Sequence, residues 1–372
     1  MKSSIMKKLL RGLAALCLLS IAAGILAFVM SSGEAANRDL VSYWAAGEQL
    51  VNRANPYDEP AIFALEKQAG LVGDRPFIMR NTPSAFFLVA PLGWLTAKGA
   101  AIAWSLTLIV MLIASVHMIR VMAGGSTDRL HLLGYLFPPV LACLLAGQMG
   151  IVLLFSVALM LYLIDSKPYF AGLALVFCTV KPQLFLPFAV VLGLWALRRR
   201  RFLLGLVSAV AFSLVMGAIL DPSGWSHYGA MMRGAGIADE FIPTLSLAFR
   251  LLIHRNAIWL QFVPCVLACL WAGWWYLRKR SWDWRTDGML VLCISVAAAP
   301  YEWLTDEAVL MPAILFGLYR SNNRALTIYA AIAGAALLLV LFGAPMTSGY
   351  YMWTCPAWLA WYWYVLSSSE PA

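Results

Sequence analysis

The stretch that decides the fold is NRDLVSYWAAGEQL, residues 37–50, because it stands just after the first long apolar run of the chain. Arg38 and Asp39 are adjacent here, where the chain is expected to leave a membrane. Asp is a preferred N-cap, so spacing alone predicts a helix that begins after Asp39. One apolar stripe recurs at helical spacing in it: Leu40, Tyr43, Trp44, Gly47, Leu50 and Val51. Short amphipathic helices over residues 40–68 would be stabilised by lying on a membrane.

The composition extends this interpretation to the whole molecule. The chain has 372 residues, of which 62% are hydrophobic and 12% are charged, and its mean hydropathy is +0.78. A soluble domain is roughly 45–50% apolar and about 25% charged. We therefore expect an all-α polytopic membrane protein, with residues 1–372 forming a single integral-membrane domain in the lipid bilayer. The formal charge of +9 is an orientation signal, and no motif for nucleic-acid binding accompanies it.

The apolar runs predict a bundle of about 10–13 transmembrane helices. We divide the domain into an N-terminal span (1–30), an outer loop (31–98), central spans (99–220), a second outer loop (221–256) and C-terminal spans (257–372). The predicted spans lie near residues 9–30, 99–121, 131–147, 149–165, 169–180, 182–197, 203–220, 257–277, 287–300, 305–320, 325–343 and 352–367.

The orientation follows from the basic residues. Lys7, Lys8 and Arg11 precede a first apolar run of about 18 residues, longer than the roughly 7–15 of a signal-peptide core, so we expect an uncleaved span. The positive-inside rule then places both termini and Arg198–Arg201 in the cytoplasm of a multi-pass plasma (inner) membrane protein. The segment TPSAFFLVAPLGW, residues 82–94, would reverse every later loop if it crossed the membrane. We therefore interpret it as a re-entrant or interfacial segment.

Metal and cofactor chemistry have little support in the sequence. The seven cysteines all stand in apolar runs without a CxxC pair, and the four histidines are scattered along the chain. We expect no metal and no cofactor.

Charges are nearly absent from the interiors of the predicted spans, and acids gather in the loops expected outside. A transporter would place ionisable groups near the bilayer midplane. The pattern therefore favours chemistry at the outer surface over passage through the membrane. Lys181, in TVKPQ, is the exception. It is either a lysine that snorkels at a helix break or a cation held near the outer face for an anionic group.

Five segments stand in a fixed order along the chain: RDLVSYWAAGEQLVNRANPYD, TPSAFFLVAPLGWL, LLAGQMGIVLLFSVALMLYLI, AGLALVFCTVKPQLFLPFAVVLGLWALRRRR and AAAPYEWLTDEAVLMPAIL. This ordered set resembles the GT-C superfamily of membrane glycosyltransferases, specifically glycosyltransferase family 87, the polyprenyl-phosphate-mannose-dependent mannosyltransferases. The family often has Tyr-Pro-Pro where this chain has NTPSAF, with only Pro83.

The resemblance implies a GT-C-like bundle and transfer of a hexose, in this family mannose. The donor would be a polyprenyl-phosphate sugar and the acceptor a glycolipid or glycan at the outer (periplasmic) face. The acid that follows the first span is implied to be the general base of an inverting transfer, and that residue is Asp39. A lipid phosphate is already a good leaving group, so this transfer needs no general acid, unlike glycoside hydrolysis with its paired carboxylates.

The remaining candidates would contact substrate. The departing phosphate needs cations, and basic residues near the outer face could supply them. Gln148, in GQMG, either belongs to a tight turn or hydrogen-bonds sugar hydroxyls. Asp306, in PYEWLTDE, either complements a helix dipole or contacts a sugar. The expected substrate-binding residues are Arg38, Tyr43, Gln148, Lys181, His227, Arg250, His254, Tyr301 and Asp306.

Two functions from other classes compete with this reading. A transporter or flippase of lipid-linked glycans would need charges along a water-filled path through the bilayer. A catalytically decayed membrane scaffold would not need Asp39 at all.

Overall fold

The computed structural model describes residues 39–125, 129–234 and 241–369, and these ranges contain helices and no strand. The predicted first span and Arg38 lie outside the described residues. The helices of the first half are α2 (Leu40–Val51), α3 (Glu59–Gln68), α4 (Phe86–Val89), α5 (Ala97–Met122), α6 (Pro138–Ala146), α7 (Gly150–Leu163), α8 (Pro168–Ala174) and α9 (Leu186–Ala196). Those of the second half are α10 (Arg200–Leu220), α11 (Gly224–Gly234), α12 (Leu245–Ile253), α13 (Val263–Arg278), α14 (Asp287–Ala297), α15 (Met311–Arg320), α16 (Asn323–Leu341) and α17 (Thr354–Ser369).

Four helical stretches are long and apolar enough to cross a bilayer: Ala97–Met122, Arg200–Leu220, Ile258–Arg278 and Asn323–Leu341. Each coincides with a predicted span, because about 20 apolar residues are needed to cross the hydrocarbon core. The chain is thus an all-α, multi-pass membrane protein. The larger number of about 10–13 spans stays a prediction.

Several other predicted spans are helices interrupted by short 3₁₀ turns. Residues 130–136 form a 3₁₀ helix before α6, residues 175–180 continue α8 as one, and residues 306–310 precede α15. Proline stands in the first turn of α6, α8 and α15, where its missing N–H costs no helix hydrogen bond. The residues before Pro138 and Pro168, Phe137 and Lys167, lie outside the helical region, so the starts of α6 and α8 follow from the sequence.

The core is built around α7. Most of α7 is buried, and it packs against α5, α8 and the 3₁₀ helix of residues 306–310. Gly150, its first residue, allows this, since a Cβ there would lie 2.0 Å from the carbonyl oxygen of Thr305. This close approach brings the loop of residues 298–305 to the start of α7.

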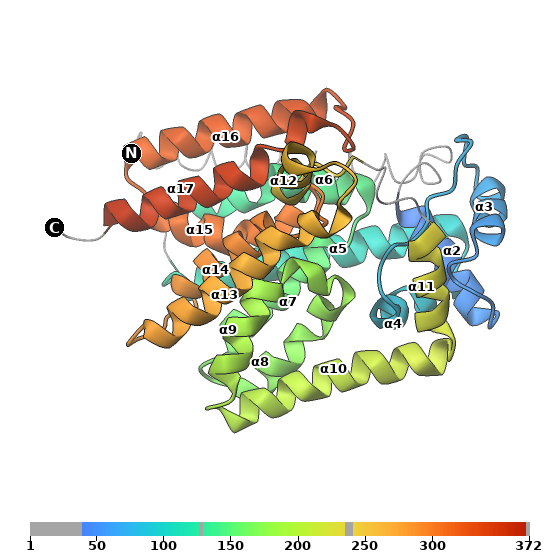
Figure 1. Cartoon of the computed structure of the whole chain (residues 1–372), viewed down its shortest axis with the longest axis horizontal. Helices are drawn as coiled ribbons and strands as arrows, with labels where there is room; N and C mark the ends of the chain where they lie inside the picture. The colour runs from blue at the N-terminus through green and yellow to red at the C-terminus, as the bar shows by residue number, and fades with distance from the viewer. Residues whose placement is uncertain (1–38, 126–128, 235–240, 370–372) are drawn as a thin grey trace, which may run out of the picture.

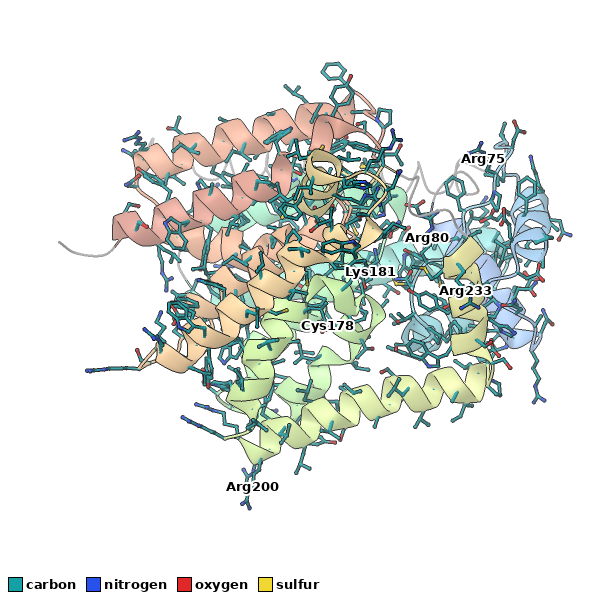
Figure 2. All side chains as sticks on the ribbon, in the orientation of Figure 1. Arg75, Arg80, Cys178, Lys181, Arg200 and Arg233 are labelled. Atoms are coloured by element: carbon teal, nitrogen blue, oxygen red, sulfur yellow. The ribbon has the colours of Figure 1, made fainter. Side chains whose placement is uncertain are left out.

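The first predicted outer loop and α11, which belongs to the second, meet at one end of the molecule. Figure 1 shows α2, α3, α4 and α11 together at the end of the long axis opposite the free end of α17. The rings of Tyr57 and Tyr228 lie 5.7 Å apart, which joins the loop after α2 to α11. Arg200, at the start of α10, lies far from this end (Figure 2). Arg200, predicted in the cytoplasm, therefore lies away from α2, α3 and α11, which are predicted outside.

The predicted helices between residues 40 and 68 are present as α2 and α3, but the expectation that both lie on a membrane surface is wrong for α2. Its residues from Leu40 to Ala46 are all buried, and it packs against α3, α5 and the segment of residues 86–94. The apolar stripe therefore faces protein.

Candidate active site

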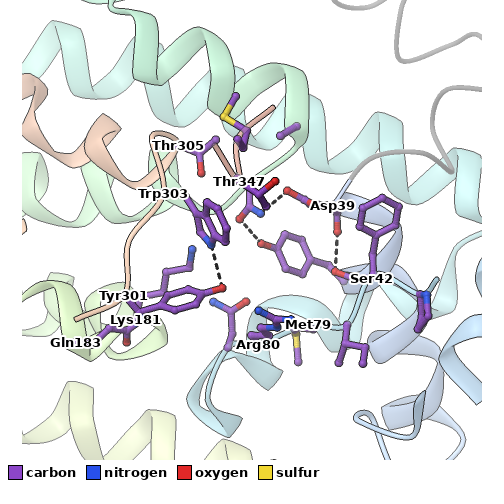
Figure 3. Close-up of a pocket in the computed structure, with 18 residues that line it drawn as sticks. Asp39, Ser42, Met79, Arg80, Lys181, Gln183, Tyr301, Trp303, Thr305 and Thr347 are labelled. Carbon is purple, nitrogen blue, oxygen red and sulfur yellow. Dashed lines mark hydrogen bonds between the residues drawn. The ribbon is translucent and has the colours of Figure 1, made fainter. Parts of the chain in front are cut away.

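A cavity of about 390 Å³ lies beside the start of α2. It is within the range of small-molecule sites, roughly 300–1,000 Å³. Residues from six separated segments form its wall, so it is a product of the tertiary fold (Figure 3). The lining residues are Asp39, Ser42, Tyr43, Pro76, Phe77, Ile78, Met79, Arg80, Asn81, Ala146, Gln148, Lys181, Gln183, Tyr301, Trp303, Thr305, Met346 and Thr347.

Asp39 stands at the N-terminus of α2, but its carboxylate does not cap the helix. Its backbone is already helical, with φ −56° and ψ −24°, and it is the backbone carbonyl that accepts from the Ser42 hydroxyl at 2.7 Å. The side chain instead accepts a hydrogen bond on Oδ2 from Nε2 of Gln148 at 2.5 Å. The cap predicted from spacing alone is therefore wrong, and the carboxylate is directed to the cavity wall.

Gln148 connects Asp39 to Tyr43. The Tyr43 hydroxyl donates to Oε1 of Gln148 at 2.6 Å, so the amide must present its NH₂ group to Asp39. Burial, and secondarily the charge of Asp39, raise the pKa of Tyr43 well above its usual value. Tyr43 thus keeps its proton as a donor, and the three side chains form one directed chain.

The turn before Gln148 depends on Gly147. This residue has φ +71°, in the left-handed region, and a Cβ there would lie 2.9 Å from Cβ of Leu40. The Trp104 indole N–H also donates to the Gly147 carbonyl at 2.7 Å. Gly147 thus serves the turn and the packing expected of GQMG. Gln148 reaches the cavity, and its contact with sugar hydroxyls stays a prediction.

Lys181 lies at the far wall as half of a buried ion pair. Its Nζ is 2.7 Å from Oδ1 of Asp306, and both side chains are nearly inaccessible. The residue joins two 3₁₀ helices and has φ −136° and ψ 66°, outside the helical region that the following Pro182 disfavours. Burial disfavours its charge, but the neighbouring Asp306 carboxylate prevails and raises its pKa. Lys181 is therefore a fixed cation and does not snorkel toward solvent.

Tyr301, Trp303 and Arg80 complete the wall near Lys181. The Trp303 indole N–H donates to the Tyr301 hydroxyl at 2.9 Å, and the two rings are perpendicular at 5.8 Å. Burial raises the pKa of Tyr301, and the nearby Arg80 guanidinium acts in the opposite direction. The site thus has a carboxylate on one side and two cations with an aromatic wall on the other.

The comparison with protein families identifies the class of this chain. A model of glycosyltransferase family 87 matches residues 80–305, which is more than half of the 372 residues. The chain belongs to glycosyltransferase family 87. It is a membrane glycosyltransferase, which agrees with the resemblance drawn from the sequence. No curated protein and no solved structure matches the chain.

The region matched to family 87 contains only part of the site. Arg80, Gln148, Lys181, Tyr301 and Trp303 fall inside it, whereas Asp39 precedes it. The family match therefore assigns no role to Asp39. The case for a role of Asp39 rests on the geometry of the cavity.

The structure brings five of the expected residues to the cavity: Asp39, Tyr43, Gln148, Lys181 and Tyr301. Asp306 stands directly behind Lys181 but does not line the cavity, so the expectation that it contacts a sugar has no support in the geometry.

Three other expected residues lie elsewhere. His227, on α11, has its Nδ1 2.8 Å from Oδ2 of Asp221. Arg250 is buried on α12, and His254 is exposed at the end of that helix. None of the three is among the residues that line this cavity. All were selected because they belong to a predicted outer loop, and loop membership does not determine position in the fold.

The sequence analysis missed Arg80, Gln183 and Trp303. Arg80 belongs to the irregular stretch FIMRN, which has no periodicity, and Trp303 was attributed to no role within PYEWLTDE. No sequence pattern singles out Arg80, which the tertiary fold brings to the cavity.

A second group of polar side chains lies outside the cavity. Ligand atoms of Glu302, Glu307 and Cys355 come within 4.8 Å of one another, and all three residues are buried. The Thr354 hydroxyl donates to Glu307 at 2.5 Å. Burial, reinforced by Glu307 and Asp306, raises the pKa of Glu302 well above its usual value. Glu302 is therefore expected to be a neutral acid, which reduces the negative charge that a metal ion would need.

Proposed function

We propose that this family 87 member is an inverting glycosyltransferase that moves a hexose, with mannose as the first donor to test, from a polyprenyl-phosphate sugar to a glycolipid or glycan. The supporting observation is that Asp39 shares one cavity with the cations Arg80 and Lys181. The base can take the proton that the acceptor hydroxyl loses, and the cations can stabilise the negative charge that grows on the departing phosphate.

Each charge has a defined part in the reaction. The acceptor oxygen attacks C1 of the sugar while the bond from C1 to the phosphate oxygen breaks and its electron pair stays on the phosphate. Asp39 takes the proton of the acceptor hydroxyl, a step that typically contributes about 10²–10⁴-fold. Arg80 and Lys181 stabilise the charge that grows on the departing phosphate. Attack opposite the leaving group inverts the configuration at C1.

Gln148 supports this role of Asp39. Its NH₂ group, oriented by Tyr43, donates to Oδ2 of the carboxylate. A hydrogen bond to a carboxylate favours the ionised form, which is the form that accepts a proton. It also fixes the rotamer, since a base must lie within hydrogen-bond reach of the proton that it takes.

The reaction is proposed to take place at the outer face of the plasma membrane. The end of the molecule that holds α2, α3 and α11 lies away from Arg200, in the basic stretch Arg198–Arg201 that the positive-inside rule assigns to the cytoplasm (Figures 1 and 2). A polyprenyl tail would remain in the bilayer while its sugar phosphate enters the cavity.

The proposal is tested by transfer of radiolabelled mannose from polyprenyl-phosphate-mannose, using purified protein in detergent with membrane lipid as acceptor. The wild type is expected to transfer label, and Asp39→Asn to lose at least about 10²-fold of the rate, because Asn cannot take the proton. Asp58→Asn is the matched control. Asp58 caps α3 by accepting from the backbone N–H of Ala61 at 3.1 Å, and Asn caps a helix equally well.

The outcomes separate the competing functions. Equal rates for wild type and Asp39→Asn would leave a glycosyltransferase with another base. A wild type that transfers no sugar from any polyprenyl-phosphate hexose, in an assay without a second compartment, would overturn the proposal and favour a transporter or scaffold.

A further inference from the structure

We propose that Asp306 is a positioning residue that fixes Lys181 and Trp303 as a two-part subsite for a sugar phosphate, with the ammonium on the phosphate and the indole face on the sugar ring. This inference rests on the proposed function and adds which residues hold the donor.

Asp306 contacts two residues that line the cavity without lining it itself. Its side chain is fully buried, with 0% exposure. Oδ1 accepts from Nζ of Lys181 at 2.7 Å, and Oδ2 accepts from the backbone N–H of Trp303 at 3.2 Å. One carboxylate therefore joins the break between two helices at residue 181 to the loop that precedes residues 306–310.

The second contact extends to the aromatic wall. The backbone of Trp303 is held by Asp306, and its indole N–H is held by Tyr301 at 2.9 Å. The ring is thus restrained at both ends, while Lys181, Tyr301 and Trp303 all border the cavity (Figure 3). The position of the cation relative to the indole is then set by Asp306 and not by mobile side chains.

This pair of groups matches the chemistry of a sugar phosphate. A lysine ammonium is a compact point charge that suits a phosphate. The face of an aromatic ring is negative, so it attracts the weakly positive C–H groups on one side of a hexose ring. A phosphate without a sugar would use only the first of these groups.

Asn cannot replace Asp306 in this arrangement. A carboxylate accepts on both oxygens, whereas an amide has one accepting oxygen and one donating NH₂ group. Asp306→Asn can therefore bind Lys181 or the Trp303 backbone but not both. It also leaves a buried ammonium without its counter-charge, which destabilises the fold.

The test is equilibrium binding of two probes, polyprenyl-phosphate-mannose and polyprenyl phosphate, to the purified full chain in detergent. The wild type is expected to bind the mannosylated lipid more tightly, and the ratio of the two affinities measures contact with the sugar. Lys181→Met should weaken binding of both probes about tenfold or more, since a charge-assisted hydrogen bond is lost. Trp303→Leu should bring the ratio close to one, and Trp303→Phe, which keeps a ring, should preserve most of it.

Asp306→Asn should weaken binding of both probes and also reduce the ratio. The double variant Lys181→Met with Asp306→Asn separates a loss of affinity caused by unfolding from one caused by loss of the subsite. Removing both charges is expected to restore the melting temperature, because no buried charge is left unpaired, but not the affinity for either probe. Glu302→Gln is the matched control. It removes a buried carboxyl from the same loop, but one already expected to be neutral, so neither the melting temperature nor binding should change.

Three results would overturn the inference: Asp306→Asn binding both probes as the wild type does, the double variant regaining affinity together with its melting temperature, or a wild type that binds neither probe. A wild type that shows the expected ratios but transfers no mannose would instead contradict the proposed function alone.

Discussion

Gln148 illustrates how a single residue can depend on a neighbour 105 positions away in the sequence, Tyr43. Tyr43→Phe would remove the donor that orients the Gln148 amide, while the ring would still pack against Trp104 at 5.9 Å. We expect a fall in kcat of about 3–10-fold with little change in KM, since an ordinary hydrogen bond contributes about 0.5–1.5 kcal/mol. Steady-state rates with the labelled donor would measure this. In a Gln148→Ala background the same substitution should have no further effect, and additive losses would show that Tyr43 acts by another route.

Glu66 gives the fold a dependence on pH. It is fully buried on α3, accepts from the backbone N–H of Phe77 at 3.0 Å, and has its pKa raised by burial from 4.5 to about 7. Between these values the folded chain binds more protons than the unfolded chain. The contribution of protonated Glu66 to the free energy of unfolding is therefore complete below about pH 4.5. It is lost as the pH rises through about 7.

Glu66→Gln keeps an acceptor for Phe77 and removes the titration. It should raise the melting temperature at pH 8, by a stability gain on the order of 1–3 kcal/mol, and leave it unchanged at pH 4.5. Thermal unfolding of the purified protein at both pH values measures the difference. Glu59→Gln, at an exposed position of the same helix, should change neither value. An equal shift at both pH values would mean that Glu66 is not the titrating group.

Asp58 and Asp39 show what spacing can establish at the residue scale. Asp58 stands directly before α3, and its carboxylate caps that helix by accepting from the backbone N–H of Ala61. That contact spans three residues, so the local sequence contains it. Asp39 has an equally favourable local pattern, but its carboxylate binds Gln148, 109 positions further along the chain. No pattern within a single helix encodes that partner.

At the scale of elements, hydropathy and proline predicted the helices well, because both act locally. The segment of residues 82–94 was expected not to cross the membrane. It consists of α4 between two 3₁₀ helices, and twelve residues from Pro83 to Trp94 would span only about 18 Å of a hydrocarbon core of about 30 Å. What the sequence did not reveal was its partner, since α2 packs directly on it and not on lipid.

This contact between elements depends on two glycines. A Cβ at Gly47 would lie 2.3 Å from the Val89 carbonyl oxygen, and one at Gly93 would lie 2.2 Å from the Gly47 carbonyl oxygen. Gly47→Ala should therefore push α2 from its neighbour, costing on the order of 1–3 kcal/mol as overpacking does, and should lower activity by displacing Asp39. Melting temperature and transfer rate measure both effects. Gly193→Ala on α9, where a Cβ would meet nothing within 4 Å, should not destabilise the protein. Equal behaviour of the two variants would show that the close packing of α2 is not required.

At the scale of the whole molecule, the cavity is the feature that the sequence could not supply. Asp39, Gln148, Lys181 and Tyr301 were each singled out on separate grounds, and only the tertiary fold brings them to one cavity. His227 and His254 were selected on similar grounds, but neither lines the cavity. Hydropathy ranks segments by depth in a membrane, but it contains no information about which segments of equal depth are neighbours.

The orientation of the molecule leads to a final prediction, because the cavity is proposed to face outward. Asp74 is exposed in the loop before the cavity-lining residues 76–81, and Arg200 is exposed at the start of α10. In intact cells, a membrane-impermeant maleimide should label Asp74→Cys, while Arg200→Cys should react only after lysis. The wild type controls for native thiols, of which Cys143, Cys265, Cys293 and Cys355 are buried. If Arg200→Cys alone were labelled in intact cells, the orientation of the protein in the membrane would be opposite to the one proposed. The acceptor and the sugar phosphate would then have to reach Asp39 from the cytoplasm, and a donor carried on the inner leaflet would replace the one proposed.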